Sequence, residues 1–144
     1  MLSEFGNTND AAIVHLTIPA KPEYLVLGRL VLTGLSRAAL IEPEALGDLK
    51  LALTEACTNS IEHAYRDGED GSVSIRIELG SSHVAIEVVD EGAGFDPAIL
   101  ADLPLEPAED GKGIAIIQAI VDELEIGAGG NGQGTRLAFT KRLD

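Results

Sequence analysis

Hydrophobic and polar side chains alternate along residues 73–79 in the middle of the chain, and a mainly apolar stretch, residues 84–89, follows closely. An alternation with a period of two is typical of a β-strand that buries one face. Because only a short turn containing Gly80-Ser81-Ser82 separates the two stretches, we predict an antiparallel hairpin. Three further strands are predicted, at residues 13–18, 124–126 and 135–140.

Hydrophobic positions three to four residues apart predict three helices. Proline is common in the first turn of a helix, and it marks helices that begin near Pro22 and Pro43. The second of these is expected to run to about Tyr65. Its apolar stripe consists of Leu46, Leu49, Leu53, Ala56, Ser60 and Ala64, with Cys57 on the flank. A third and shorter helix is expected from Gly113 to about Val121.

The predicted elements follow the order strand, helix, helix, strand, strand, loop, helix, strand, strand. Paired strands with helices arriving in blocks are typical of an α+β sandwich, whereas a Rossmann fold needs strict alternation. We therefore expect two layers, with the helices on one face of a mainly antiparallel mixed sheet. A chain of 144 residues has the size of one domain. We place that domain at residues 12–144, after a flexible polar segment at residues 1–11.

The charge balance limits the kinds of partner that the chain can have. There are 10 Lys and Arg against 24 Asp and Glu, which gives a formal net charge of −14. Nucleic acids and anionic membranes are bound mainly through clustered Lys and Arg, so we expect neither as a partner. The single cysteine excludes an internal disulfide and fits a reducing compartment. With no signal-peptide pattern and no apolar run of membrane-spanning length, we expect a cytoplasmic protein.

The second predicted helix carries polar side chains away from its apolar stripe. Glu55 and Asn59 are four residues apart and therefore lie on adjacent turns, and His63 continues the row. A carboxylate and an amide at this spacing can place a general base beside a ligand of hydrated Mg²⁺, which prefers oxygen donors. The alternative is a solvated polar face, on which His63 interacts with the last carbonyls of the helix.

A glycine-containing segment, Asp90-Glu91-Gly92-Ala93-Gly94-Phe95-Asp96, follows the second strand of the hairpin directly. An aspartate at the end of a strand can accept a hydrogen bond from an exocyclic amine. Neighbouring glycines let a flat ring approach the backbone. The alternative is an ordinary turn after a strand, which this residue pattern commonly marks.

A second glycine pair, Gly111-Lys112-Gly113, stands just before the third predicted helix. Free N–H groups and the positive end of the helix dipole at such a helix start suit a phosphate, although the Walker A pattern is missing. The alternative is a flexible hinge. A third segment, Gly132-Gln133-Gly134-Thr135, precedes the last strand. An acidic chain that binds an anion must use Mg²⁺ and backbone dipoles, and these segments together with Asn59 provide such groups.

Taken in order, the four segments resemble the motifs of the GHKL ATPase superfamily with its Bergerat nucleotide-binding fold. The likeness is greatest to the bacterial anti-sigma factor serine/threonine kinases, also called switch-protein kinases. Residues 55–65, EACTNSIEHAY, resemble the N box of this family, and residues 90–96 resemble its first glycine box. The second glycine box is matched from Gly111 onward. The closing segment is matched from Gly134 to Lys141.

The resemblance implies a role for each matching position. Glu55 would be the base that activates the attacking hydroxyl, Asn59 would hold Mg²⁺, and Asp90 would read the adenine amino group. The remaining nucleotide-binding positions would be His63, Gly92, Gly94, Gly111, Lys112, Gly113 and Thr135. Residues 96–112 would form a lid over ATP.

Members of this family phosphorylate a serine or threonine of a STAS-type anti-anti-sigma protein, bind a sigma factor, and are usually homodimers. The resemblance therefore implies an ATP- and Mg-dependent kinase in a partner-switching system. The sequence departs from the pattern just before the second glycine box, where Glu109 and Asp110 stand in place of the arginine that many members have. The alternative is an ATP-regulated anti-sigma or adaptor module with little or no kinase activity.

Overall fold

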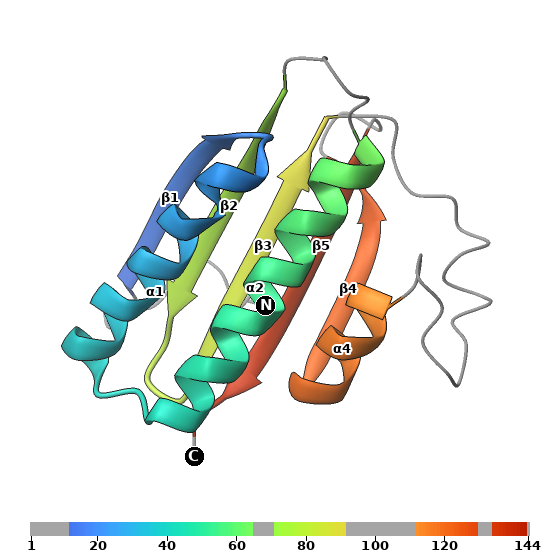
Figure 1. Ribbon diagram of the computed structural model, residues 1–144. Helices are drawn as coiled ribbons and strands as arrows, with labels where there is room; N and C mark the ends of the chain where they lie inside the picture. Colours follow the sequence, from blue (N-terminus) through green and yellow to red (C-terminus); the bar gives the residue numbers. More distant parts are fainter. Residues whose placement is uncertain (1–11, 65–70, 92–111, 130–133, 144) are drawn as a thin grey trace.

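The computed structural model describes residues 12–64, 71–91, 112–129 and 134–143, and its elements follow the predicted order (Figure 1). The strands are β1 (Ala12–Pro19), β2 (Ser72–Leu79), β3 (His83–Asp90), β4 (Glu123–Ala128) and β5 (Thr135–Arg142). The helices are α1 (Leu25–Ala39), α2 (Pro43–Ala64) and α4 (Lys112–Ile120). A short 3-10 helix, η1 (Pro22–Tyr24), precedes α1, so the first predicted helix begins with a tighter turn.

The five strands form one sheet in the order β1-β2-β3-β5-β4. The predicted hairpin is confirmed, since β2 pairs antiparallel with β3 and Ile77 lies opposite Ile86. The other three pairings of these strands, β1 with β2, β3 with β5 and β4 with β5, are antiparallel as well. The prediction of a mainly antiparallel sheet is confirmed. None of the pairings between the described strands is parallel. Two of the predicted segments, the flexible N-terminus and residues 96–111 of the lid, lie outside the described residues.

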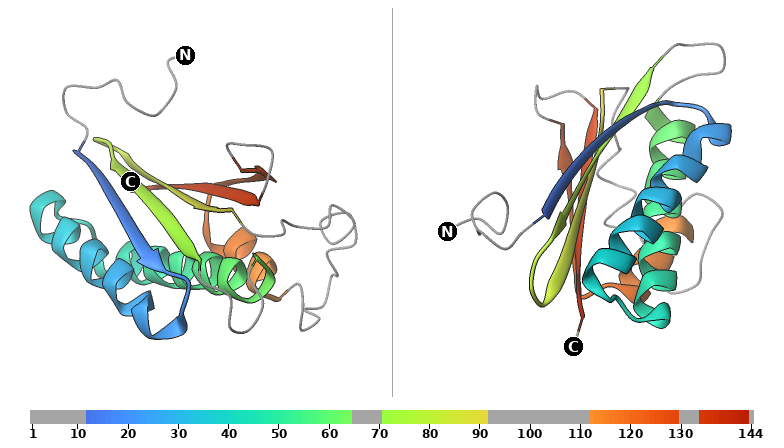
Figure 2. Two further views of the ribbon diagram at one scale, coloured as in Figure 1. Left: turned by 90° about the horizontal axis from the view of Figure 1, so that it is seen from above. Right: turned by 90° about the vertical axis from the view of Figure 1, so that its left-hand side faces the viewer.

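The three helices α1, α2 and α4 of the described residues cover the same face of the sheet, which gives the two-layer α+β sandwich expected from the sequence (Figure 2). The core between the layers is aliphatic apart from Phe139 and the thiol of Cys57. Its largest fully buried side chains are Phe139, Ile18, Leu32, Leu49, Leu53, Ile75, Ile77, Ile86, Ile114, Ile117 and Leu137. Alternate residues of each inner strand contribute to this core, as a period of two requires.

The helix α2 occupies the middle of the helical layer, between α1 and α4, and also contacts β2, β3 and β5. Leu49, Leu53 and Ala56 of its predicted apolar stripe are buried. A second stripe, at residues 48, 52, 55 and 59, follows the spacing of four, three and four that keeps side chains on one side of a helix. Ala52 and Asn59 of this second stripe are buried too. The buried arc of α2 is therefore wider than its hydrophobic pattern predicts.

None of the helices in the described part of the chain is long and apolar enough to cross a membrane.

The thiol of Cys57 faces the core, and burial raises its pKa to about 12. Because the thiolate is the reactive form, we expect a disulfide reagent such as DTNB at pH 8 to modify the native protein at least ~100-fold more slowly than the urea-unfolded protein. The unfolded thiol loses its proton near pH 9.0 and the folded one near 12, so stability should fall as the pH rises through that window. Equal modification rates in the two states would contradict this burial.

Candidate functional site

Two polar residues, one from β3 and one from β5, meet where β3 ends and β5 begins. Because β3 and β5 are antiparallel, Asp90 at the end of β3 lies directly opposite Thr135 at the start of β5. Figures 1 and 2 show the C-terminal end of α2 at the same end of the sheet. The topology therefore brings two of the predicted segments together, although 45 residues separate Asp90 from Thr135.

Asp90 is held in a defined orientation at this sheet end. Its side chain is buried, with an exposed fraction of 2%, and Thr135 is 5% exposed. The backbone N–H of Thr135 donates a hydrogen bond to Oδ1 of Asp90 over 3.2 Å. A buried carboxylate is costly unless it is hydrogen-bonded, so this contact both stabilises and orients the group. A carboxylate fixed in this way is suited to accept a hydrogen bond from a ligand amine.

Gly134 is required by the close approach of two backbones at this sheet end. Its φ is +73°, and a Cβ at this position would lie 2.0 Å from the backbone O of Asp90 and 2.8 Å from Cα of Glu91. A side chain does not fit there, and a positive φ favours glycine in any case. The glycine of the closing segment thus lets the start of β5 lie against the end of β3.

Glu55 and Asn59 lie on the side of α2 that faces α4. The Oε2 atom of Glu55 is 3.1 Å from the place that a Cβ on Gly113 would take, so the carboxylate lies against the first turn of α4. Glu55 is half-buried, and Asn59, one turn further along α2, is 9% exposed. A fully solvated polar face is therefore the wrong interpretation for Asn59. The first turn of a helix offers N–H groups without helical partners and a positive dipole end, which suit an anion.

Several predicted site residues are not placed by the structure. Gly92, Gly94 and Gly111 lie outside the described residues, as do the acidic positions Glu109 and Asp110. His63 belongs to the last turn of α2 and Lys112 is the first residue of α4, but their side chains lie outside the described part. The structure thus brings together two pairs, Glu55 with Asn59 and Asp90 with Thr135, and sets Gly113 against Glu55.

The described residues contain no group of three or more His, Cys, Asp and Glu side chains that could hold a metal ion. Mg²⁺ keeps several water ligands and commonly uses one or two protein ligands together with substrate phosphates. The buried amide of Asn59, one turn from Glu55, fits that mode of binding better than a complete protein cage.

Replacing Gly134 by alanine tests the close approach at the sheet end. We expect Gly134→Ala to lower the free energy of unfolding by at least about 1–3 kcal/mol, because the new Cβ overlaps the backbone of Asp90 and the positive φ is unfavourable. Gly127→Ala on β4 is the matched control, since a Cβ there meets nothing within 4 Å. Urea unfolding measures both variants, and equal midpoints would contradict the steric explanation.

The comparison with known proteins agrees with the fold and with the family resemblance. Residues 18–141 match the family model of the histidine kinase-like ATPase domain. A protein of Bacillus pumilus named serine-protein kinase RsbW is 37% identical over 143 residues, which cover 92% of this chain and 86% of that protein. Proteins of the same name from Bacillus subtilis and Listeria innocua are 32% and 35% identical, over 94% and 78% of this chain.

Two solved structures share the fold. The RsbU and RsbW domains of Rv1364c from Mycobacterium tuberculosis match with a TM-score of 0.65 and 22% identity over 92% of this chain, which spans about a third (32%) of that protein. The mycobacterial sensor histidine kinase MprB matches with a TM-score of 0.54 and 16% identity, over 90% of this chain and 97% of that one. The chain belongs to the histidine kinase-like ATPase family and, within it, to the serine-protein kinases of the RsbW type.

Proposed function

We propose that this kinase uses ATP and Mg²⁺ to phosphorylate a serine or threonine on a STAS-type anti-anti-sigma protein, and that it also binds a sigma factor. The observation that carries the proposal is the contact of the Glu55 carboxylate with the first turn of α4. This contact supports the proposal because a base at Glu55 would lie beside the helix start that suits phosphates. The names of the relatives, serine-protein kinase RsbW, support the same reaction class.

The adenine end of the proposed site lies at the junction of β3 and β5. The buried Asp90 carboxylate, oriented by the N–H of Thr135, would accept a hydrogen bond from the adenine amino group. The flat ring would lie against the backbone beyond Asp90, at the positions of Gly92 and Gly94. Because the carboxylate is already desolvated and fixed, it would select an amine donor over a carbonyl acceptor.

The phosphate end of the proposed site would lie between α4 and the second stripe of α2, which contains Glu55 and Asn59. The N–H groups at Gly111, Lys112 and Gly113 would bind the phosphates together with the helix dipole. Asn59 would supply an amide oxygen to Mg²⁺, and His63 belongs to the same set of nucleotide-binding positions. When bound, Mg²⁺ supplies positive charge that offsets the negative charge of the phosphates. In a chain of net charge −14, dipoles and a metal are the available means of holding a polyanion.

Glu55 would act on the substrate hydroxyl. As the serine or threonine oxygen attacks the γ-phosphorus, the carboxylate would accept the proton of the hydroxyl group. The bond between the γ-phosphorus and the bridging oxygen would break, and ADP would be released as the leaving group. Phosphoryl transfer depends mainly on positioning and on charge stabilisation, so the fixed place of Glu55 against α4 suits this role. A partner of a sigma factor shares its compartment, so the proposal includes the cytoplasm. It also includes a homodimer, by resemblance to the family.

The second candidate function is an ATP-regulated anti-sigma or adaptor module with little or no transfer activity. It is favoured by one observation, that Glu109 and Asp110 stand where many family members have an arginine. Both candidates bind Mg-ATP, and they differ in whether phosphate reaches a partner protein.

Removing the charge of Glu55 separates the two candidates. We expect Glu55→Gln to keep ATP affinity nearly unchanged and to slow transfer by about 10²–10⁴-fold, the usual effect of losing a general base. Transfer is measured with labelled ATP and the STAS proteins encoded by the same genome. Glu44→Gln, at an exposed site in the first turn of α2, is the control and should transfer at the wild-type rate.

Two results would contradict the kinase mechanism in different ways. If the wild-type protein phosphorylates none of these STAS proteins, the binding-module candidate is favoured. If Glu55→Gln transfers as fast as the wild type, Glu55 is not the base.

Nucleotide binding tests Asn59 independently of transfer. We expect calorimetry to show ATP and ADP binding that EDTA weakens, because Asn59 holds Mg²⁺ beside the phosphates. Asn59→Ala should bind ATP more weakly and should lose most of the effect of EDTA. A variant whose affinity still depends on Mg²⁺ as strongly as the wild type would contradict the assignment of Asn59.

A further inference from the structure

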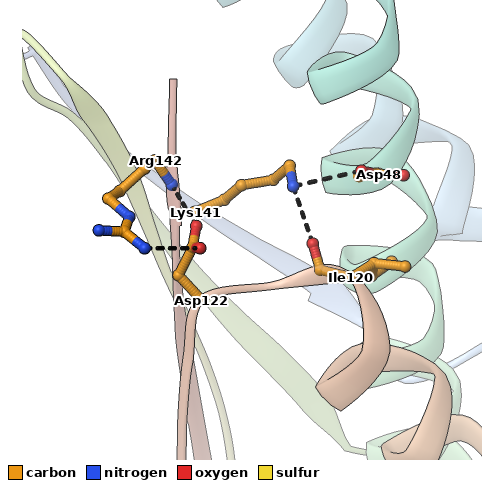
Figure 3. A network of polar contacts seen from close by, with 5 residues as sticks. All are labelled: Asp48, Ile120, Asp122, Lys141 and Arg142. Carbon is orange, nitrogen blue, oxygen red and sulfur yellow. Dashed lines mark hydrogen bonds and ion pairs between the residues drawn. The ribbon is translucent and has the colours of Figure 1, made fainter. Parts of the chain in front are cut away.

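A network of polar contacts at the C-terminal end of α4 joins β5, α4 and α2 through residues that the proposed reaction has not used (Figure 3). The side-chain Nζ of Lys141, on β5, donates a hydrogen bond to the backbone O of Ile120 over 2.9 Å. The same ammonium forms an ion pair with Oδ2 of Asp48, on α2, at 3.2 Å. The Lys141 side chain is only 17% exposed, so this pair is shielded from solvent more than a surface salt bridge is.

The ammonium of Lys141 meets a helix end that has no cation of its own. The last turn of α4 contains no basic residue. Carbonyl groups at the end of a helix lack helical partners, and a positive charge there is favourable for the helix dipole. Lys141 supplies that charge from a strand, and by binding Asp48 it fastens the end of α4 to α2.

The two ends of α4 contact α2 at positions that have the same spacing along both helices. At the N-terminal end, Gly113 lies against Glu55. At the C-terminal end, Ile120 is linked through Lys141 to Asp48. Seven residues separate the two positions on each helix, which corresponds to about 10.5 Å along either axis. The contact at Lys141 and the contact at Glu55 therefore fix one and the same antiparallel register of α4 on α2.

We propose that Lys141 is a positioning residue for phosphoryl transfer, which together with Asp48 sets the register of α4 on α2 and so the place of the bound phosphates relative to Glu55. The inference rests on the proposed kinase function. Buried Ile114 and Ile117 also hold α4 in place, but apolar packing is not directional. A hydrogen-bonded ion pair specifies the position along the helix axis. A misplacement of about 1 Å at reacting groups can lower a rate ~100-fold.

The test compares Lys141→Met with Arg142→Met. Methionine keeps an apolar stem and removes the ammonium. We expect Lys141→Met to lower kcat for transfer to the STAS protein by about 10- to 100-fold. ADP affinity should stay within about twofold, because the adenine end at Asp90 is not held by this pair. Arg142→Met is the matched control. It removes a cation from the next residue, whose side chain is 69% exposed and pairs with Asp122 rather than with a residue of α2.

Two further variants distinguish positioning from a general loss of structure. Lys141→Arg keeps the charge and should recover most of the transfer rate. In the double variant Lys141→Met/Asp48→Asn, transfer should fall little below that of Lys141→Met, because both changes remove the same interaction. If the effects of Lys141→Met and of Asp48→Asn, each measured alone, multiply in the double variant instead, Asp48 and Lys141 act separately and the proposal is overturned.

Three other results decide the matter. Equal kcat values for Lys141→Met and Arg142→Met would overturn the positioning role, as would a loss of ADP affinity in proportion to the loss of transfer. In the first case the wild type still transfers phosphate, so the proposed kinase function survives. A wild type that transfers no phosphate would contradict the kinase function and the role of Lys141 with it. Circular dichroism at the assay temperature confirms that each variant is folded.

Discussion

The central helix α2 must bury three of its sides, and the other elements are arranged around that requirement. Its leucine stripe packs on the sheet, one flank contacts α1, and the opposite flank contacts α4. Alanines at positions 52 and 56 are fully buried, which allows neighbours to approach closely. Because these contacts leave little freedom to rotate or slide, polar residues on the flank that faces α4 have fixed positions. That rigidity suits a chemical role, since preorganised groups need not be ordered during the reaction.

The same flank of α2 carries two acidic residues in different environments. Asp48 is neutralised by Lys141 near the end of α4, where the helix dipole is negative. Glu55 lies two turns away, against the first turn of α4, where the dipole is positive. The short helix α4 therefore presents opposite ends to the two carboxylates. Only the end near Glu55 has the polarity that favours an anionic ligand.

The junction where β3 ends and β5 begins is organised by a different constraint, the close approach of two backbones. Gly134 lets the start of β5 lie against Asp90, and the first N–H of β5 then orients the Asp90 carboxylate. The two parts of the proposed site thus depend on separate elements. One is built by helix packing and the other by strand pairing, so a ligand that contacts both would connect the helical layer with the sheet.

Local periodicity determined much of this protein without any tertiary information. A period of two placed β2, the short turn after it placed the β2–β3 hairpin, and a spacing of three to four residues placed α1, α2 and α4. Both spacings record which side of an element is buried. The spacing of Glu55 and Asn59 also put them on one side of α2. The spacing does not show which element covers that side of α2. The covering helix α4 begins 48 residues after α2 ends, and its own sequence pattern does not indicate which helix it packs against. Only the tertiary structure decided that Asn59 is buried, that Gly134 touches Asp90, and that Lys141 reaches Asp48. Each of these is a contact between residues distant in sequence, fixed by strand order and helix packing rather than by neighbouring side chains.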